Sequence, residues 1–378
     1  MKIVQLITRM DTVGGAQIHV RDILNGQRRS GNSMYLLAGG GENVHKLLVE
    51  DNTHQIYSKH LIRSLNIIAD IKAVFEIRKI IKGISPDIIA VHSSKAGIIG
   101  RIVGWSLRIP TVFTVHGWSF TEGVPIKQKR IYILIEKVIG IISDGVITVS
   151  EYDNSLALQH GILPAGKVIT VHNGVHDMDI CDMERDLNII PRITMVARFS
   201  PPKKQLQLLK VLTYIKDLPW EMFFVGDGPL LKEAQDFARN EGMSDRVFFL
   251  GNRKDVAEVL CESHIFVLLS DWEGLPLSIL EAMRSGLPIV ASDVGGVKEA
   301  VLQSINGFVI ARNDENDLRN KLTLLLMNST LRSEMGQGSR VLYEQNFTFE
   351  QMHEKTLDYY KKVIKIKRNK IPIKESTV

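Results

Sequence analysis

The sequence predicts an α/β fold of two Rossmann-like, doubly wound domains that face each other across a cleft. The chain has 378 residues, 44% of them hydrophobic, which is long for one core and suits two domains. Short β-branched strands alternate with amphipathic helical patterns, as in mostly parallel sheets covered by helices. After the turn signal Asn173-Gly174, an acidic and aperiodic segment that ends in Pro191 indicates a linker.

The first domain is expected at residues 1–175. Helical periodicity separates most of its strands and covers residues 17–28, 65–82, 97–107 and 127–139. Strands are expected near residues 2–7, 34–38, 54–57, 87–91, 111–115, 145–149 and 168–172.

The second domain, with the linker, is expected at residues 176–378. Helices close the chain, including residues 317–327 and a last helix at about 349–368. Strands are expected near residues 193–197, 221–225, 246–250, 265–269, 289–291 and 308–310.

Composition and terminal sequence indicate a cytoplasmic protein. The first ten residues have too short an apolar part for a signal peptide, and no run approaches 18 uninterrupted apolar residues, so a membrane-spanning helix is not expected. Cys181 and Cys261 are too few for a disulfide framework or a zinc site, which suits a reducing compartment.

The net charge of +5 is concentrated in a basic tail. Such a tail could bind an anionic membrane or nucleic acid, or be a solvated terminus. Because the sequence has no helix-turn-helix, zinc-finger or RNA-binding signature, nucleic acid is not an expected partner. The tail cations are Lys361, Lys362, Lys365, Lys367, Arg368, Lys370 and Lys374.

The most informative segment, residues 264–296, has the order strand, loop, helix, strand. Its helix should start near Pro276 or Leu277, since proline fits the first helical turn. A helix N-terminus after a parallel strand is a site for phosphate. Glu273 in the loop and Glu281 in the helix would flank it, and carboxylates accept hydrogen bonds from sugar hydroxyls. A nucleotide sugar has this layout; an ordinary loop acid and a solvated helix residue are the alternative.

A cationic loop follows the first strand of the second domain. Arg198 and Lys203 flank Pro201-Pro202 there, and two fixed cations can neutralise a diphosphate. Ordinary surface charge is the alternative. Two further strand-end turns contain Gly228 and Asn252, and the backbone near Asn252 could bond a base.

Three strand ends of the first domain are further candidates. Gly14-Gly15 lets backbone N–H groups approach a ligand, although it lacks the GxGxxG pattern and a tight turn would explain it equally well. His116 follows one strand and His92 ends the preceding one; a structural histidine is the alternative for each.

An acidic motif in the linker is treated as a coincidence. Asp177-Met178-Asp179 has the DxD spacing that binds a metal and a nucleotide sugar in a different transferase fold, but it does not lie at a strand end.

In combination, these motifs resemble glycosyltransferase family 4, the retaining enzymes of GT-B fold. The resemblance covers residues 2 to about 348 and rests on an ordered set. Its members are GlyGlyAlaGln, ValHisGlyTrp, AsnGlyVal, ArgPheSerProProLys, ValGlyAspGlyPro and the E-x7-E pair within EGLPLSILEAM. The family's closing helix normally crosses back to the first domain, which suits the last helix here.

The resemblance implies a role for each matching residue. Arg198 and Lys203 would hold the donor diphosphate, with Lys204 replacing Lys203 if the loop is shifted. Glu281 would bind the ribose hydroxyls and Glu273 the transferred sugar. His116 would line the site near the reacting sugar. The other donor-binding residues would be Gly14, Gly15, Gly228, Asn252, Gly274, Leu275, Pro276 and Leu277.

The resemblance further implies front-face attack with retention, since neither glutamate is placed as a nucleophile if both hold hydroxyls. We expect no cofactor and no metal requirement, because two cations and a helix N-terminus take the metal's role. The donor is expected to be a nucleotide-diphosphate sugar with a lean towards UDP. The acceptor is expected to be a lipid-linked glycan of O-antigen, capsule or exopolysaccharide synthesis.

Other functions stay open on sequence alone. A nucleotide-sugar epimerase of GT-B-type fold would need no acceptor, and a non-catalytic nucleotide-sugar-binding subunit would show no turnover. Basic and apolar helices near residues 71–79 and 126–131 could rest on anionic lipid at the inner face of the cytoplasmic membrane, or pack on the sheet.

Overall fold

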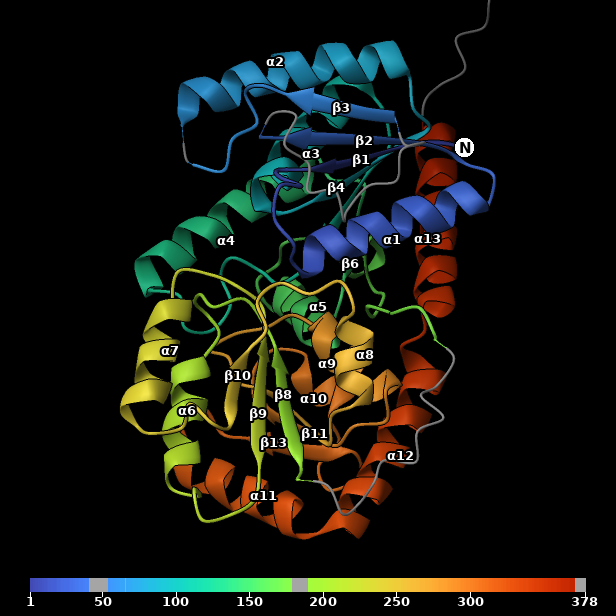
Figure 1. Cartoon of the computed structure of the whole chain (residues 1–378). Coiled ribbons are helices and arrows are strands. Elements are labelled where there is room, and N and C mark those ends of the chain that lie inside the picture. The colour runs from blue at the N-terminus through green and yellow to red at the C-terminus, as the bar shows by residue number, and fades with distance from the viewer. Residues whose placement is uncertain (41–53, 65, 179–189, 371–378) are drawn as a thin grey trace, which may run out of the picture. The chain divides into compact units, whose positions relative to one another are not determined.

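The computed structural model describes residues 1–40, 54–64, 66–178 and 190–370. The chain divides into two compact units (Figure 1). The first comprises Met1–His172 together with the chain from Met352 onward, and the second comprises Asn173–Gln351. The expected boundary at residue 175 lies close to this division.

The first unit is built on one parallel sheet of seven strands, in the order β3-β2-β1-β4-β5-β6-β7. The order reverses between β1 and β4, which is the switch point where ligand crevices form in such sheets. The strands are β1 Lys2–Ile7, β2 Ser33–Gly39, β3 His54–Ser58, β4 Ile88–His92, β5 Thr111–Val115, β6 Gly145–Thr148 and β7 Val168–Thr170.

Helix α3 packs tightly on this sheet because it carries a row of glycines. A Cβ at Gly100 would lie 2.4 Å from Val91 Cγ1, and one at Gly104 would lie 1.9 Å from Thr111 Oγ1. Side chains would therefore force α3 away from β4 and β5. The helices of this unit are α1 Gly15–Arg29, α2 Ile67–Ile84, α3 Ser94–Leu107, α4 Ile126–Ile141, α5 Glu151–Gln159 and most of α13 Phe349–Lys370, with the short 3₁₀ turn Ala165–Lys167.

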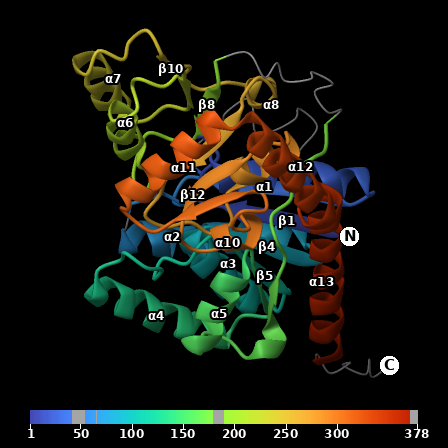
Figure 2. The same ribbon diagram turned by 90° about the horizontal axis from the view of Figure 1, so that it is seen from below.

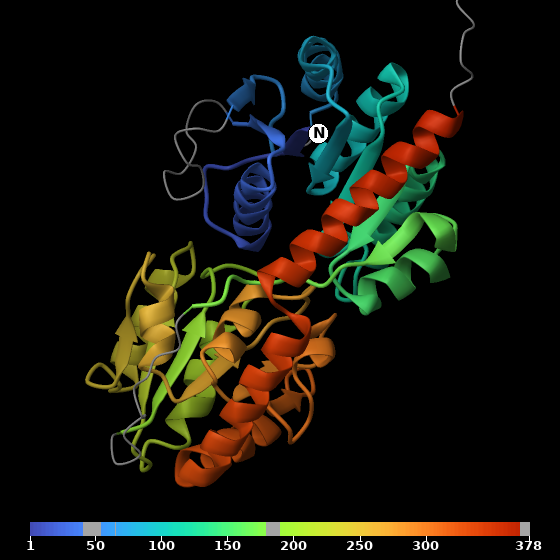
Figure 3. The same cartoon turned by 90° about the vertical axis from the view of Figure 1, so that its right-hand side faces the viewer.

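Helix α13 is the last described element and lies against the first sheet (Figure 3). Tyr359 donates its hydroxyl to the Lys167 carbonyl at 2.7 Å, and Lys367 pairs with Asp144 at 2.7 Å. Part of the basic tail is therefore engaged in structural contacts.

The second unit has a parallel sheet of six strands in the order β10-β9-β8-β11-β12-β13 (Figures 1 and 2). Its strands are β8 Arg192–Val196, β9 Glu221–Val225, β10 Val247–Phe249, β11 Ile265–Leu268, β12 Ile289–Ser292 and β13 Gly307–Ile310. Its helices are α6 Gln205–Thr213, α7 Leu231–Asn240, α8 Val256–Cys261, α9 Leu277–Arg284, α10 Val297–Ala300, α11 Glu315–Met327 and α12 Ser329–Asn346.

The structure confirms the predicted fold class, two Rossmann-like α/β units with parallel sheets. Small differences occur at helix starts: α3 begins at Ser94 rather than residue 97, since polar residues in a first turn hide the apolar periodicity. Among the described helices, none is long and apolar enough to cross a membrane. Cys181 lies outside the described residues.

Candidate functional site

The loop after β11 leads into α9 as the pattern predicts. Pro276 precedes the first helical residue, Leu277, in an extended conformation with φ −72° and ψ 125°. The first turn of α9 contains no acidic residue. Its unpaired N–H groups therefore present the positive end of the helix dipole to an anion at the carboxyl edge of the sheet.

Two other segments fix the backbone of this loop. The side-chain amide of Asn173 donates to the Leu275 carbonyl at 2.7 Å. A Cβ at Gly295, where φ is +56°, would lie 1.9 Å from the Glu273 carbonyl oxygen, so only glycine fits there. Asn173 was expected as a turn signal and as part of the AsnGlyVal motif, and the structure shows that its side chain positions the loop.

Two predicted donor-binding side chains form an ion pair. Lys203 donates from Nζ to Glu273 Oε1, and the Ser270 hydroxyl donates to the same oxygen at 2.5 Å. The Lys203 and Glu273 side chains are 17% and 12% exposed. An isolated bridge between Lys203 and Ser270 brings the loops after β8 and β11 side by side. The sequence predicted both residues but not their contact.

Lys204, the alternative to Lys203, has different partners. Its Nζ lies 2.6 Å from Asp271 Oδ1 and 2.5 Å from Asn313 Oδ1. Of the two neighbouring lysines, Lys203 is therefore the one that meets Glu273.

The loop that carries Arg198 is braced by a glycine turn. Phe199 donates its N–H to the Asp227 carbonyl at 3.0 Å, and the Gln205 amide donates to the Arg198 carbonyl at 3.0 Å. A Cβ at Gly228, where φ is +154°, would lie 2.4 Å from the Phe199 carbonyl oxygen. Gly228 is thus required for the packing of these loops, while the Arg198 side chain is exposed.

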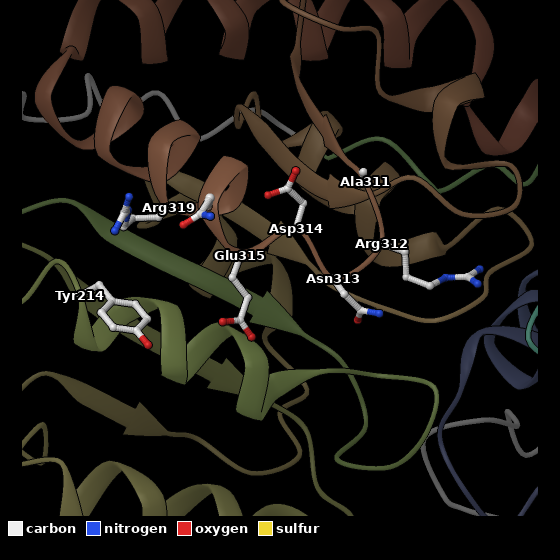
Figure 4. Close-up of a pocket in the computed structure, with 8 residues that line it drawn as sticks. Tyr214, Ala311, Arg312, Asn313, Asp314, Glu315 and Arg319 are labelled. Atoms are coloured by element: carbon white, nitrogen blue, oxygen red, sulfur yellow. The ribbon is translucent and has the colours of Figure 1, made fainter.

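Two cavities adjoin this region. The smaller, of about 300 Å³, is lined by Lys203, Lys204 and Asn313 among others. The larger, of about 710 Å³, shares Asn313 and extends along the loop after β13 and the start of α11 (Figure 4). Its lining carries both signs of charge and contains neither Glu273 nor Glu281, so we do not assign it as the donor site. The larger cavity is lined by Tyr214, Ala311, Arg312, Asn313, Asp314, Glu315, Asn316 and Arg319.

In the first unit, Gly14 and Gly15 open helix α1. Gly14 is the N-cap, and the first turn contains no acidic residue. A Cβ at Gly15 would meet nothing within 4 Å, so the packing of the fold does not require glycine there. The open backbone fits close approach by a ligand.

Three histidines gather at the carboxyl ends of β4 and β5. His92 Nδ1 lies 3.1 Å from His116 Nε2, and the His19 ring of α1 packs edge-on against His116 with centroids 4.7 Å apart. His92 Nε2 lies 2.7 Å from the side-chain oxygen of Gln5. The ligand atoms of the three histidines lie within 4.8 Å of one another, a spacing that could hold a metal ion.

Burial lowers the pKa of His92 and of His116 well below the usual range, and the neighbouring His19 lowers both further. His92 and His116 are therefore neutral at pH 7. His116 and His92 were predicted from the sequence, but His19 and Gln5 were not. Gln5 could have been identified from its position, because it is a polar residue in the centre of the apolar strand β1.

The linker motif has a structural partner. Both carboxylate oxygens of Asp177 accept hydrogen bonds from Arg340, at 2.7 and 2.8 Å, and this bonding lowers the pKa of Asp177. Asp179 lies outside the described residues.

The predicted site residues are divided between the two units. The first contains Gly14, Gly15 and His116. In the second, Glu281 lies half-buried on α9 and Asn252 is exposed after β10. The others in the second unit are Arg198, Lys203, Gly228, Glu273, Gly274, Leu275, Pro276 and Leu277.

Two family models match the chain and together span most of it. The model described as Glycosyltransferase Family 4 matches residues 13–178, and the model described as Glycosyl transferases group 1 matches residues 190–341.

Characterised relatives and solved structures agree with these matches. The chain is 28% identical over 317 residues to UDP-Gal:alpha-D-GlcNAc-diphosphoundecaprenol alpha-1,3-galactosyltransferase of Escherichia coli, covering 78% of this chain and 82% of that protein. It is 28% identical over 324 residues to the O-antigen biosynthesis glycosyltransferase WbnH of Escherichia coli, covering 85% and 89%. The sucrose-phosphate synthase of Thermosynechococcus elongatus has the same fold, with a TM-score of 0.83 at 20% identity over 97% of this chain and 100% of that chain.

Proposed function

Since the chain belongs to glycosyltransferase family 4 and has the GT-B fold, we propose that it is a retaining, metal-independent hexosyltransferase that uses a UDP-sugar and a lipid-linked glycan acceptor. Glycosyltransferase activity in polysaccharide biosynthesis follows from the family and from relatives named for O-antigen synthesis. The relative that names UDP-galactose and a diphosphoundecaprenol-linked sugar supports the choice of donor nucleotide and acceptor class.

The observation that carries the donor-site proposal is the Lys203–Glu273 pair beside the acid-free N-terminus of α9. The donor diphosphate binds Arg198, Lys203 and the backbone N–H groups of Gly274, Leu275 and Leu277. Glu281 accepts hydrogen bonds from the ribose hydroxyls, and Glu273 accepts hydrogen bonds from the hydroxyls of the transferred sugar. Anionic phosphate favours cations and a helix N-terminus, and neutral hydroxyls favour carboxylates.

Retention is proposed to proceed by front-face attack. The acceptor hydroxyl oxygen bonds to the anomeric carbon on the side that the phosphate oxygen leaves, and that phosphate oxygen takes the hydroxyl proton. Glu273 already accepts from Lys203 and Ser270, which disfavours a role as nucleophile. Arg198 and Lys203 stabilise the charge that develops on the diphosphate, so no metal is needed.

We also propose that the enzyme binds the inner face of the cytoplasmic membrane through α4. This helix buries its acidic residue, Glu136, against Arg101 and leaves an apolar face outward. Cations on the same helix complement anionic lipid headgroups. The exposed apolar residues are Ile126, Ile131, Leu134, Ile135, Val138 and Ile141, and the cations are Lys127, Lys129, Arg130 and Lys137.

Helix α2 of the same unit carries exposed apolar side chains of its own. Ile67, Ile68 and Phe75 are 79%, 68% and 70% exposed, and Arg78 of α2 donates to Ser106 of α3. Exposed apolar side chains that are grouped on one helix are typical of membrane or protein contacts, and the cations among them favour the membrane.

The test of function is UDP release from UDP-galactose, UDP-glucose or UDP-N-acetylglucosamine, in excess EDTA, with a GlcNAc-diphosphoundecaprenol acceptor. We expect acceptor-dependent release and a product with the donor's anomeric configuration. Inversion, or activity restored only by Mg²⁺, would contradict the mechanism. Conversion of the UDP-sugar without acceptor would indicate the epimerase instead.

Membrane binding is tested separately by flotation with neutral and with anionic liposomes. The double variant Leu134→Gln, Val138→Gln should bind liposomes at least about tenfold more weakly than the wild type, because one buried aliphatic side chain contributes about 1.5–3 kcal/mol. Met327→Gln, at a residue 73% exposed in the second unit, is the matched control. Equal flotation of all three proteins would rule out α4.

A further inference from the structure

A chain of polar side chains runs through the buried part of the first unit to His116. It starts at Gln5 in the middle of β1, continues through His92 at the end of β4 and reaches His116 after β5. Gln5 and His92 are fully buried. Buried hydrogen bonds of this kind favour one geometry, because breaking them leaves further donors or acceptors unpaired.

The hydrogen bonds determine the tautomer of each ring. The Gln5 oxygen can only accept, so His92 Nε2 carries the proton and donates across 2.7 Å. A neutral imidazole then has a lone pair on its other nitrogen, so His92 Nδ1 accepts across 3.1 Å from His116 Nε2–H. His116 must in turn leave Nδ1 unprotonated.

We infer that Gln5 and His92 are positioning residues that hold His116 as its Nε2–H tautomer, so that His116 Nδ1 accepts a hydrogen bond from a substrate sugar hydroxyl. This inference rests on the proposed function only for the identity of that hydroxyl. A ring that is fixed in orientation and neutral adds no positive charge beside a sugar ring that becomes cationic as the glycosidic bond breaks. The low pKa of His116 agrees with this role.

The far end of this row of side chains lies beside α13. Tyr360 is fully buried; burial raises the pKa of its phenol, and Gln5 and Thr114 act in the opposite direction. Gln5 Nε2, Thr114 Oγ1 and the Tyr360 hydroxyl form no hydrogen bond with the described residues, so the Gln5 side chain is held by the bond between its oxygen and His92 Nε2. The three side chains come from β1, β5 and α13.

The same three histidines could instead hold a metal ion, and the two arrangements differ in where the ring protons lie. The 3.1 Å separation of His92 Nδ1 and His116 Nε2 fits a direct hydrogen bond and also two ligands of one ion, so the Zn²⁺ arm of the experiment below decides between them. In a metal site both nitrogens would have to present lone pairs to the ion, and no proton would join them.

The first experiment needs no substrate. The full chain is labelled with ¹⁵N-histidine, and long-range ¹H–¹⁵N spectra at pH 7.5 report the protonation of each ring nitrogen, with His92→Asn and His116→Asn for assignment. We expect the Nε2–H tautomer for both rings, unchanged by one equivalent of Zn²⁺. An Nδ1–H or charged His116, or a shift of all three histidines with Zn²⁺ that EDTA reverses, would overturn the inference.

The second experiment separates positioning from structural support. Gln5→Leu should give His116 a mixture of tautomers and lower kcat about tenfold, with KM for the donor little changed. Gln5→Glu should not restore either, because a carboxylate beside His92 Nε2 favours a charged His92 whose Nδ1 can no longer accept from His116. A loss of thermal stability in Gln5→Leu with an unchanged tautomer would show a purely structural role. Failure of UDP to raise the melting temperature of the wild type would instead reject the proposed function and leave the tautomer result standing.

Discussion

Replacement of Glu136 by glutamine should strongly destabilise the first unit. Glu136 Oε2 lies 2.8 Å from Arg101 Nη2, and the two side chains are 4% and 0% exposed. Arg101 also donates to the Gly97 carbonyl at 2.8 Å and lies 4.5 Å above the Phe113 ring. Burial lowers the pKa of Arg101, and Glu136 opposes that shift. Loss of the carboxylate leaves the guanidinium charged and buried without its counterion.

Breaking a buried ion pair costs about 3–5 kcal/mol, and we expect about 3 kcal/mol because glutamine retains a neutral acceptor. For a unit of this size, 1 kcal/mol corresponds to about 2–4 °C, so the melting temperature should fall by about 6–12 °C. Hydrogen exchange read by mass spectrometry should show the loss in β4 and β5 peptides, with the second unit unchanged.

The matched control is the double variant Arg101→Met, Glu136→Leu, which removes both charges and keeps the volume. Its stability should lie within about 1–2 kcal/mol of the wild type, since replacing a buried pair by apolar residues is often neutral. If Glu136→Gln alone unfolds at the wild-type temperature, the pair does not carry the assigned energy. If the double variant is as unstable as the single one, packing rather than charge explains the loss.

Three further predictions follow from the site. Lys203→Met should lower kcat by about 10²–10³ with a smaller change in KM, measured by steady-state UDP release, because its proposed role is to stabilise the charge on the leaving diphosphate. Glu273→Gln should bind UDP more tightly by calorimetry and yet turn over more slowly, since it frees the Lys203 cation and loses a sugar ligand; weaker UDP binding would count against the pairing. Stability should fall as the pH decreases below about 6.5, by up to about 1.4 kcal/mol per pH unit for each of His92 and His116, because the unfolded chain binds protons there that the folded cluster does not. Urea unfolding between pH 5 and 8 measures the sign of this pH dependence, and His92→Asn should make the free energy of unfolding less dependent on pH.

Strand ends could be predicted from the sequence because the carboxyl ends of parallel strands meet at one edge of a sheet. That rule identified His92, His116, Arg198 and Lys203 as candidates before any contact was known. It could not identify the Lys203–Glu273 pair, because the two residues are 70 positions apart and their contact depends on two loops lying together. Gln5 was missed since its neighbours in β1 are apolar and read as core.

Helix α4 shows a second limit of sequence patterns. Apolar periodicity identifies a helix with an apolar face, but it does not say which face meets the sheet. A buried charge determines which face of α4 meets the sheet. Arg101 is buried on α3, and a buried cation needs a counterion, which Glu136 supplies. Pairing turns the Glu136 side of α4 inward and the Leu134 and Val138 side outward. The proposed membrane-binding face and the ion pair are therefore two consequences of one helix orientation. The double variant Arg101→Met, Glu136→Leu removes this pair. If α4 rotates as a result, liposome binding should weaken, even though neither residue is expected to contact lipid.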